Sequence, residues 1–253
     1  MIWLRALLLI LALVLPVQAE EIVADMSQAR VAITADFDGS EILIFGAIRR
    51  EAPLPAGPMS VVITVEGPST PVTVRKKDRV AGIWINTEAV DVDAAPSFYA
   101  IATSAPLREA ITETEDLRHH VSIPQAIRAV DAATGAENAE DFVDALIRIR
   151  ASNDLYQLLE EEITVSADTL FDTLISLPSN LTEGTYRTRI FLTREGDVID
   201  QFETAIDVRK VGLEKFIYNL AHDRPLIYGL FSLFIAIAAG WLASAFFRYI
   251  RGA

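Results

Sequence analysis

The sequence predicts a mainly β ectodomain with a helical middle segment, followed by one C-terminal transmembrane helix. Three observations support this fold class. Short runs of β-branched residues alternate with turn residues through residues 20–105 and again through residues 161–210. Residues 106–160 instead place apolar residues at helical spacing. Residues 225–247 contain no Asp, Glu, Lys, Arg or His, and a helix of this length can cross a hydrocarbon core of about 30 Å.

Residues 1–19 are typical of a secretory signal peptide. Arg5 precedes an apolar run over residues 6–15, and Pro16 ends that run. Residues 17–19, Val-Gln-Ala, place small residues at the two positions that a signal peptidase reads. The apolar run is too short to span a bilayer unaided, although an uncleaved N-terminal anchor remains the alternative.

The first β-region, residues 20–105, contains six short runs that favour strands. They cover residues 31–34, 41–48, 60–66, 72–76, 82–86 and 98–104. Residues 42–45 are apolar without alternation, which predicts a central strand covered on both faces. Residues 75–79 form a basic run, which we interpret as a solvated hairpin tip rather than a contact for a ligand or a headgroup.

The middle segment, residues 106–160, predicts helices that pack on the sheet. Helical composition begins after Pro106, over residues 107–119. Asn138 can cap a second helix over residues 139–151. An apolar stripe follows the helical period of that second helix. Its members are Phe142, Ala145, Leu146 and Ile149.

The second β-region, residues 161–210, completes or adjoins the first. Residues 185–194 and 198–209 flank a Glu-Gly-Asp turn and predict a hairpin. Just before this hairpin, Leu181, Gly184 and Tyr186 have the spacing of the tyrosine corner of Greek-key sandwiches. This motif favours an Ig-like or Greek-key β-sandwich, and leaves open whether the two β-regions form one sandwich or two.

The C-terminal part predicts a single-pass protein of a bacterial inner membrane. Residues 211–224 fit an amphipathic juxtamembrane helix, residues 225–247 the transmembrane helix and residues 248–253 a cytoplasmic tail. Arg248 and Arg251 agree with the positive-inside rule, which places the N-terminal domain in the periplasm. The absence of cysteine from the sequence also fits export to a bacterial periplasm.

Charge and spacing restrict the expected partners. The net charge of −13 argues against nucleic acid as a ligand. Within the transmembrane helix, Ala236, Gly240 and Ser244 recur at every fourth residue. Small residues at this spacing let another helix approach closely, so we expect self-association or contact with a polytopic membrane protein in the lipid bilayer.

Catalytic chemistry has little support in the sequence. A stretch of acids and histidines offers weak candidates for metal ligands, because adjacent histidines on a helix point about 100° apart. These candidates are Glu113, Glu115, Asp116, His119 and His120. The sequence contains no cysteine, no G-x-S-x-G and no nucleotide-binding glycine motif. We therefore expect no enzyme activity, no catalytic residue and no cofactor.

Several segments together resemble a family of alphaproteobacterial transmembrane proteins of unknown function. They are EILIFGAIRR (41–50), VVITVEGP (61–68), VRKKDRVAGIWINTEAV (74–90), FYAIATSAPL (98–107) and the terminal span. The resemblance implies a periplasmic domain on one C-terminal helix. It also implies a genomic neighbourhood with permeases similar to sulfite or sulfonate exporters, and it assigns no functional residues.

The sequence thus predicts a non-catalytic, membrane-anchored periplasmic accessory protein. We expect it to associate with a membrane partner, for example a permease similar to sulfite or sulfonate exporters. One alternative is a periplasmic metal-dependent binding protein or hydrolase that uses residues 113–120. Another is a purely structural envelope protein.

Overall fold

The structure, a computed structural model, describes residues 20–34, 36–50, 57–129 and 139–251. The predicted signal peptide, residues 1–19, lies outside the described residues. The chain divides into two compact units. Unit 1 holds residues up to 31 together with residues 38–208, and unit 2 holds residues 32–37 and 209–253.

Unit 1 contains a four-stranded antiparallel sheet in the order β1-β3-β10-β9. Its strands are β1 (Glu20–Met26), β3 (Ser40–Arg50), β10 (Leu170–Leu177) and β9 (Thr164–Ser166). Alternate residues of β3 and β10 are buried, as in a sheet with one face in a core. Strands from both β-regions of the sequence therefore share this sheet.

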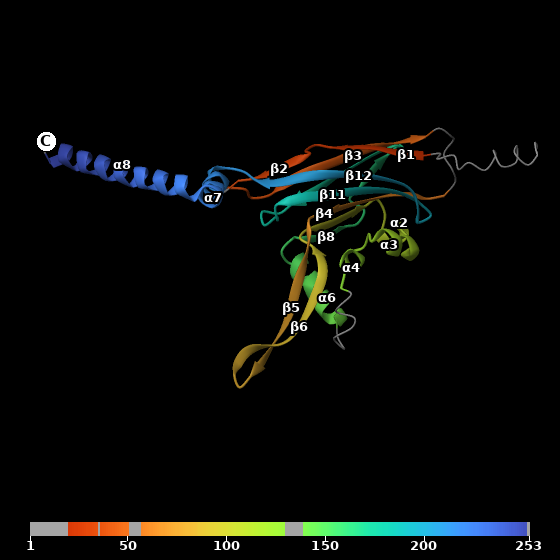
Figure 1. Cartoon of the computed structure of the whole chain (residues 1–253). Helices are drawn as coiled ribbons and strands as arrows, with labels where there is room; N and C mark the ends of the chain where they lie inside the picture. The colour runs from red at the N-terminus through yellow and green to blue at the C-terminus, as the bar shows by residue number, and fades with distance from the viewer. Residues whose placement is uncertain (1–19, 35, 51–56, 130–138, 252–253) are drawn as a thin grey trace, which may run out of the picture. The chain divides into compact units, whose positions relative to one another are not determined.

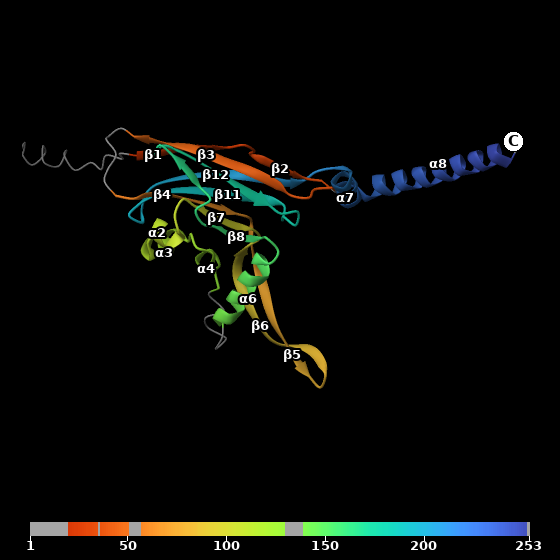
Figure 2. The same cartoon turned by 180° about the vertical axis from the view of Figure 1, so that it is seen from behind.

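A second sheet has six strands in the order β2-β12-β11-β4-β7-β8. They are β2 (Arg30–Ile33), β12 (Asp197–Lys210), β11 (Gly184–Arg194), β4 (Met59–Glu66), β7 (Tyr99–Thr103) and β8 (Tyr156–Leu159). The β7–β8 pair is parallel. Figures 1 and 2 show the four-stranded sheet lying over one face of this sheet.

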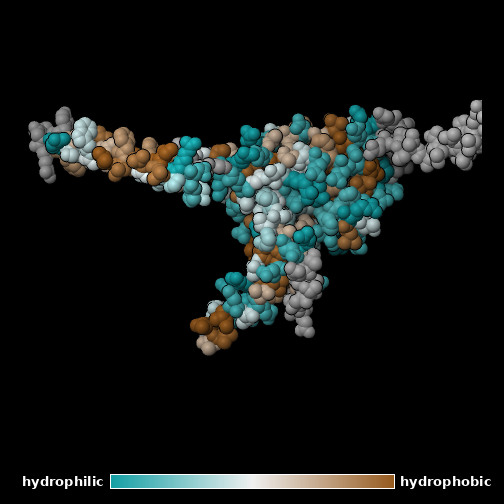
Figure 3. All heavy atoms as spheres, in the orientation of Figure 1, coloured by the Kyte–Doolittle hydropathy of each residue, from teal (hydrophilic) through white to brown (hydrophobic). Residues whose placement is uncertain are grey.

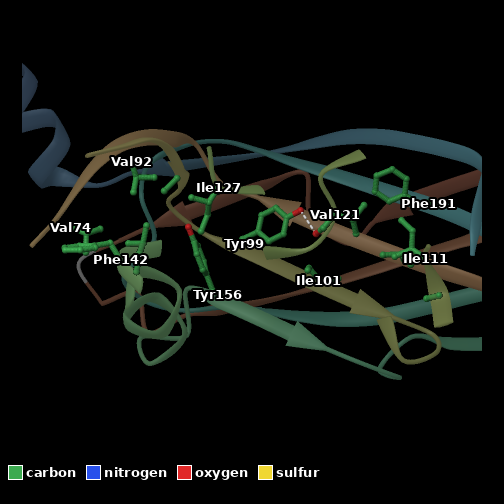
Figure 4. Packing of buried hydrophobic residues seen from close by; sticks show 14 of the residues in the cluster. Val74, Val92, Tyr99, Ile101, Ile111, Val121, Ile127, Phe142, Tyr156 and Phe191 are labelled. Carbon is green, nitrogen blue, oxygen red and sulfur yellow. Dashed lines mark hydrogen bonds between the residues drawn. The ribbon is translucent and has the colours of Figure 1, made fainter. Parts of the chain in front are cut away.

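Helices cover the other face of the six-stranded sheet (Figure 1). They are α2 (Leu107–Ala110), α3 (Glu113–His119), α4 (Ile123–Ala126) and α6 (Ala139–Ala151). Tyr99, Ile101 and Phe191 from the sheet pack with Phe142 of α6 and Val121, which follows α3, in one buried cluster (Figure 4). Strand β4 is buried along nearly its whole length because it has a layer on each face.

A long hairpin, β5 (Ser69–Val80) and β6 (Ile83–Pro96), extends from this cluster. Its base contributes Val74 and Val92 to the buried cluster. Ala81 and Gly82 form the two-residue turn, and both have positive φ, at 51° and 89°. Every residue from 75 to 89 is exposed, and we call this segment the hairpin arm.

Unit 2 consists mainly of two helices, α7 (Leu213–Asp223) and α8 (Pro225–Arg251). Among the described residues, α8 is the one helix long and apolar enough to cross a membrane, over Pro225–Arg248. None of this stretch is buried against the rest of the chain. A mainly β fold with one C-terminal apolar helix is thereby confirmed, while the Ig-like or Greek-key connectivity stays a prediction.

Some local expectations were wrong. Strand β3 lies between β1 and β10, as expected of a central strand. Residues 42–45 are not covered on both faces, however, because Phe45 is 42% exposed. The helical run 107–119 is divided into α2 and α3. Ile149, expected in the packed stripe of α6, is 53% exposed, whereas Phe142 and Leu146 of the same stripe are buried.

Candidate functional site

A cleft of about 740 Å³ lies where α3, α4 and the segment after α4 meet the edge of the helix-covered face of the six-stranded sheet. This volume falls in the usual range of small-molecule sites. Four arginines and two glutamates line it, which makes the lining cationic in a chain whose net charge is −13. The charged lining residues are Glu66, Arg118, Arg128, Arg187, Arg189 and Glu203.

Arg189 is the most deeply placed of these cations, since only 7% of the residue is exposed. Its Nη1 donates to the carbonyl of His119 at 2.6 Å, and its Nη2 donates to the carbonyl of His120 at 3.2 Å. The guanidinium carbon lies 5.3 Å from the centre of the Phe191 ring, close enough for a cation–π contact. Arg189 therefore interacts with the C-terminal end of α3, where the helix dipole favours a cation.

No described carboxylate lies within ion-pairing distance of Arg189. Its Nε is buried and finds no hydrogen-bond acceptor among the described residues. Burial of a charge without a counter-charge is costly. The cleft thus retains a positive charge that the described part of the chain does not neutralise.

The end of α3 is held in place by local capping and by the sheet. Asp116 accepts hydrogen bonds from the backbone N–H groups of Val121 and Ser122, at 3.1 and 2.7 Å. His120 ends the helix in the left-handed conformation at φ 51°. The Tyr99 hydroxyl donates to the carbonyl of Val121 at 2.8 Å (Figure 4). Burial raises the pKa of Tyr99 to about 12, so this hydroxyl keeps its proton and remains a donor.

The other arginines of the cleft differ in their pairing. Arg187 makes a 2.5 Å ion pair with Glu66, and Arg118 pairs with Glu115. Arg128 is exposed, and among the described residues no carboxylate pairs with it. Backbone hydrogen bonds in both directions with Ala94 fix its position beside β6. Arg128 is therefore the exposed cation of the cleft that could bind an incoming anion, and buried Arg189 adds positive charge behind it.

The predicted metal-ligand stretch is used differently. Glu115 is buried and contacts both Arg118 and the Nε2 atom of His119, the latter at 3.3 Å. Asp116 accepts the two backbone hydrogen bonds described above. Glu113 begins α3 and is exposed, and His120 lines the cleft. Within the described ranges no three His, Cys, Asp or Glu side chains gather as a metal site would need.

Gly184 and Tyr186 of the predicted tyrosine corner begin β11, and Leu181 lies just before this strand. Leu181 and Tyr186 are buried, and the Tyr186 hydroxyl donates to the carbonyl of Thr182 at 2.9 Å. Gly184 has φ 156°, and a Cβ added there would lie 2.8 Å from the Cγ atom of Pro68. We propose that this contact acts as the tyrosine corner, which fixes the chain as it enters β11.

The predicted packing residues of the membrane helix are exposed on α8. Ala236, Gly240 and Ser244 have no cover from the described chain, and a Cβ added at Gly240 would meet nothing within 4 Å. The structure therefore leaves this small-residue face available to another helix.

Sequence reasoning missed Arg128, Arg187 and Arg189. A signal existed in β11, where two arginines two residues apart precede a buried phenylalanine on the same face of the strand. An arginine on the apolar side of a half-buried strand indicates a specific polar partner or a site. Arg128 had no comparable signal, because its position depends on the bridge to Ala94.

The fold and the exposed apolar helix define a membrane-anchored protein with a mainly β extramembrane unit. The family described as "Putative transmembrane protein (Alph_Pro_TM)" matches residues 21–249, and the chain belongs to this family. No curated protein matches the chain. Among solved structures, the sporulation control protein Spo0M from Bacillus subtilis is similar at 7% identity and a TM-score of 0.29, over 81% of this chain and 55% of that one.

Proposed function

We propose that the protein is a non-catalytic accessory protein of a bacterial inner membrane, and that its β unit binds a small anion for a membrane-spanning partner. In this proposal α8 crosses the membrane once, unit 1 lies in the periplasm and the C-terminus lies in the cytoplasm. The positive-inside position of Arg248 and the signal-like residues 1–19 support this topology.

The observation that carries the ligand class is the cationic lining of the cleft, where exposed Arg128 has no carboxylate partner among the described residues and buried Arg189 adds a second positive charge. Guanidinium groups recognise carboxylate, sulfonate and phosphate oxygens through paired N–H donors. They also hold their proton firmly, so they suit the binding of an anion better than proton transfer. This favours a binding role for the cleft over a hydrolytic one.

The partner is a polytopic membrane protein, and the exposed small-residue face of α8 supports its contact with that helix. A permease that carries sulfur oxyanions is the partner that the family resemblance implies. The sulfur oxyanions that such a permease carries are negatively charged, which suits binding in the cationic cleft. The metal-dependent alternative has no geometric observation in its favour, because ion pairs and caps explain the contacts of Glu115 and Asp116.

Anion binding is tested with the full chain in mild detergent by titration calorimetry, using sulfate, inorganic phosphate and a small dicarboxylate. We expect binding of at least one probe. Arg128→Gln should weaken that binding about 10-fold or more, because a hydrogen bond to a charged group contributes about 1.5–3 kcal/mol. Arg49→Gln is the matched control, since Arg49 is an exposed arginine in β3, outside the cleft. Absence of heat with all three probes, or equal effects of the two variants, would contradict the proposal.

Partner contact is tested by purification from native membranes. We expect a membrane protein to co-purify with the wild type and to be lost with Gly240→Leu. Ala238→Leu is the control, because two residues turn a helix by about 200° and place this change on the opposite face. Co-purification that survives Gly240→Leu would remove α8 packing from the proposal.

A further inference from the structure

The end of the hairpin arm exposes a group of large apolar side chains. Val80, Ile83, Trp84 and Ile85 are between 40% and 68% exposed, and Trp84 has the highest value. Figure 3 shows a brown, hydrophobic surface at the end of this arm, next to a teal, hydrophilic surface. Single exposed apolar residues are ordinary on protein surfaces, but a contiguous group at the end of a projecting ribbon indicates a contact surface.

The register of the hairpin places apolar side chains on both faces of the ribbon. Val80 pairs with Ile83, and Trp84 pairs with Arg79 one position further from the turn. Because successive residues of a strand point to opposite faces, Ile83 and Trp84 face opposite ways. A flat partner surface or a one-sided groove could cover only one of these faces, whereas a medium that surrounds the tip covers both.

The arm is also cationic directly behind this tip. Arg75, Lys76, Lys77 and Arg79 follow one another along β5 with a single acid, Asp78, between them. On β6 the arm adds one more acid, Glu88, which pairs with Lys76 at 3.6 Å. The arm therefore carries a net charge of +2 within a chain of net charge −13.

We propose that the hairpin arm inserts its tip into the headgroup region of an anionic lipid bilayer, the same bilayer that α8 crosses. Tryptophan favours the membrane interface, and an apolar end followed by cations is the pattern of segments that bind anionic membranes peripherally. The anchor raises the effective concentration of bilayer around unit 1, so even a weak interaction of the tip is populated. This second contact fixes how unit 1 is oriented above the membrane and is independent of the anion cleft.

Tryptophan fluorescence tests this directly, because the sequence has only three tryptophans. In the full chain, Trp3→Phe and Trp241→Phe leave Trp84 as the sole reporter. The protein is reconstituted into vesicles of phosphatidylcholine alone or with phosphatidylglycerol, with and without brominated acyl chains. We expect a blue-shifted emission and clear quenching by the brominated lipid when phosphatidylglycerol is present. Arg75→Glu combined with Lys77→Glu should abolish most of that quenching.

A matched reporter outside the arm distinguishes insertion from general adsorption. Trp84→Phe and Leu174→Trp in the same background move the tryptophan to an exposed apolar position of β10. We expect little quenching at this position. If Trp84 emits at the wavelength of a water-exposed tryptophan and is not quenched in either lipid mixture, the proposal is overturned. The arm would then be expected to contact a protein partner instead. Equal quenching of the two reporters, or quenching unaffected by charge reversal, would overturn it as well.

Discussion

Glu20 joins the two sheets of unit 1 and offers the sharpest test of what stabilises the fold. Its carboxylate accepts a hydrogen bond from Nε of Arg50 at 2.7 Å, within the four-stranded sheet, and one from Nη2 of Arg194 at 2.6 Å, from β11 of the six-stranded sheet. The side chain of Glu20 is 4% exposed. Glu20→Gln removes the negative charge to which both arginines donate hydrogen bonds.

Removal of one member of a buried ion pair costs about 3–5 kcal/mol. We take about 3 kcal/mol for Glu20→Gln, because the amide oxygen can still accept a hydrogen bond. A domain of this size loses about 2–4 °C in Tm per kcal/mol, so we expect Tm to fall by about 6–12 °C. The assay is thermal unfolding of the full chain in mild detergent, followed by the circular dichroism of the β structure at neutral pH.

The adjacent residue supplies the control. Glu21 pairs with Arg49, but both side chains are more than half exposed, so Glu21→Gln should cost only about 0–1 kcal/mol. Equal losses of Tm in the two variants would refute the assignment of a buried interaction to Glu20. Because Glu20 and Glu21 are neighbouring residues of the same type, the two variants differ mainly in how deeply the ion pair is buried.

The effect of Glu20 should also depend on pH in a defined direction. Burial opposes ionisation of Glu20, but hydrogen bonds and charges from Arg194 and Arg50 outweigh it and lower the pKa below the ordinary value of 4.5. A lowered folded-state pKa stabilises the fold fully above the unfolded-state pKa, and this stabilisation disappears as pH falls through the folded-state pKa. The Tm difference between wild type and Glu20→Gln should therefore shrink below pH 4.5. A difference that is constant down to pH 3 would contradict the ion pair.

Three further substitutions test packing and buried hydrogen bonds by the same unfolding assay. Gly46→Ala should cost about 1–3 kcal/mol, because the new Cβ would lie 2.5 Å from Cζ of Phe171, and an unchanged Tm would contradict this close packing. Tyr99→Phe should cost about 1–3 kcal/mol, because it leaves the carbonyl of buried Val121 without the tyrosine hydroxyl. Tyr186→Phe should cost only about 0.5–1.5 kcal/mol, because the carbonyl that its hydroxyl binds belongs to an exposed residue, and a larger loss than for Tyr99→Phe would reverse this interpretation.

Local patterns were sufficient for the fold class and for the membrane helix. The absence of charge from residues 225–247 leaves few alternatives to a span, and the hairpin around residues 195–197 follows from its turn residues. Which strand is covered on both faces was not predictable in this way. Residues 42–45 and the strand β4 are both apolar runs, and only the layer of helices decides that β4 has two covered faces.

The candidate cleft was less accessible to sequence reasoning because long-range pairing builds it. Arg189 and Arg128 are 61 positions apart in the sequence, yet both line one cleft. They meet there because the segment after α4 packs on the face of the sheet to which the Arg189 side chain of β11 points. Strand β8 was missed for a similar reason, since its parallel partner β7 lies far earlier in the chain. Residues 75–79 were predicted as a solvated hairpin tip from their basic run. They are exposed as expected, but they lie within β5, and the turn comes at Ala81 and Gly82.

The placement of β12 has a mechanical consequence. This strand is the last strand of the chain that the structure describes, and it lies between β2 and β11. Helices α7 and α8 follow its end at Lys210. Ladder hydrogen bonds run across a strand, so a force that pulls along β12 from the anchored end loads many of them at once in shear. The fold can therefore resist a force applied through its membrane anchor, because many ladder hydrogen bonds would have to break together.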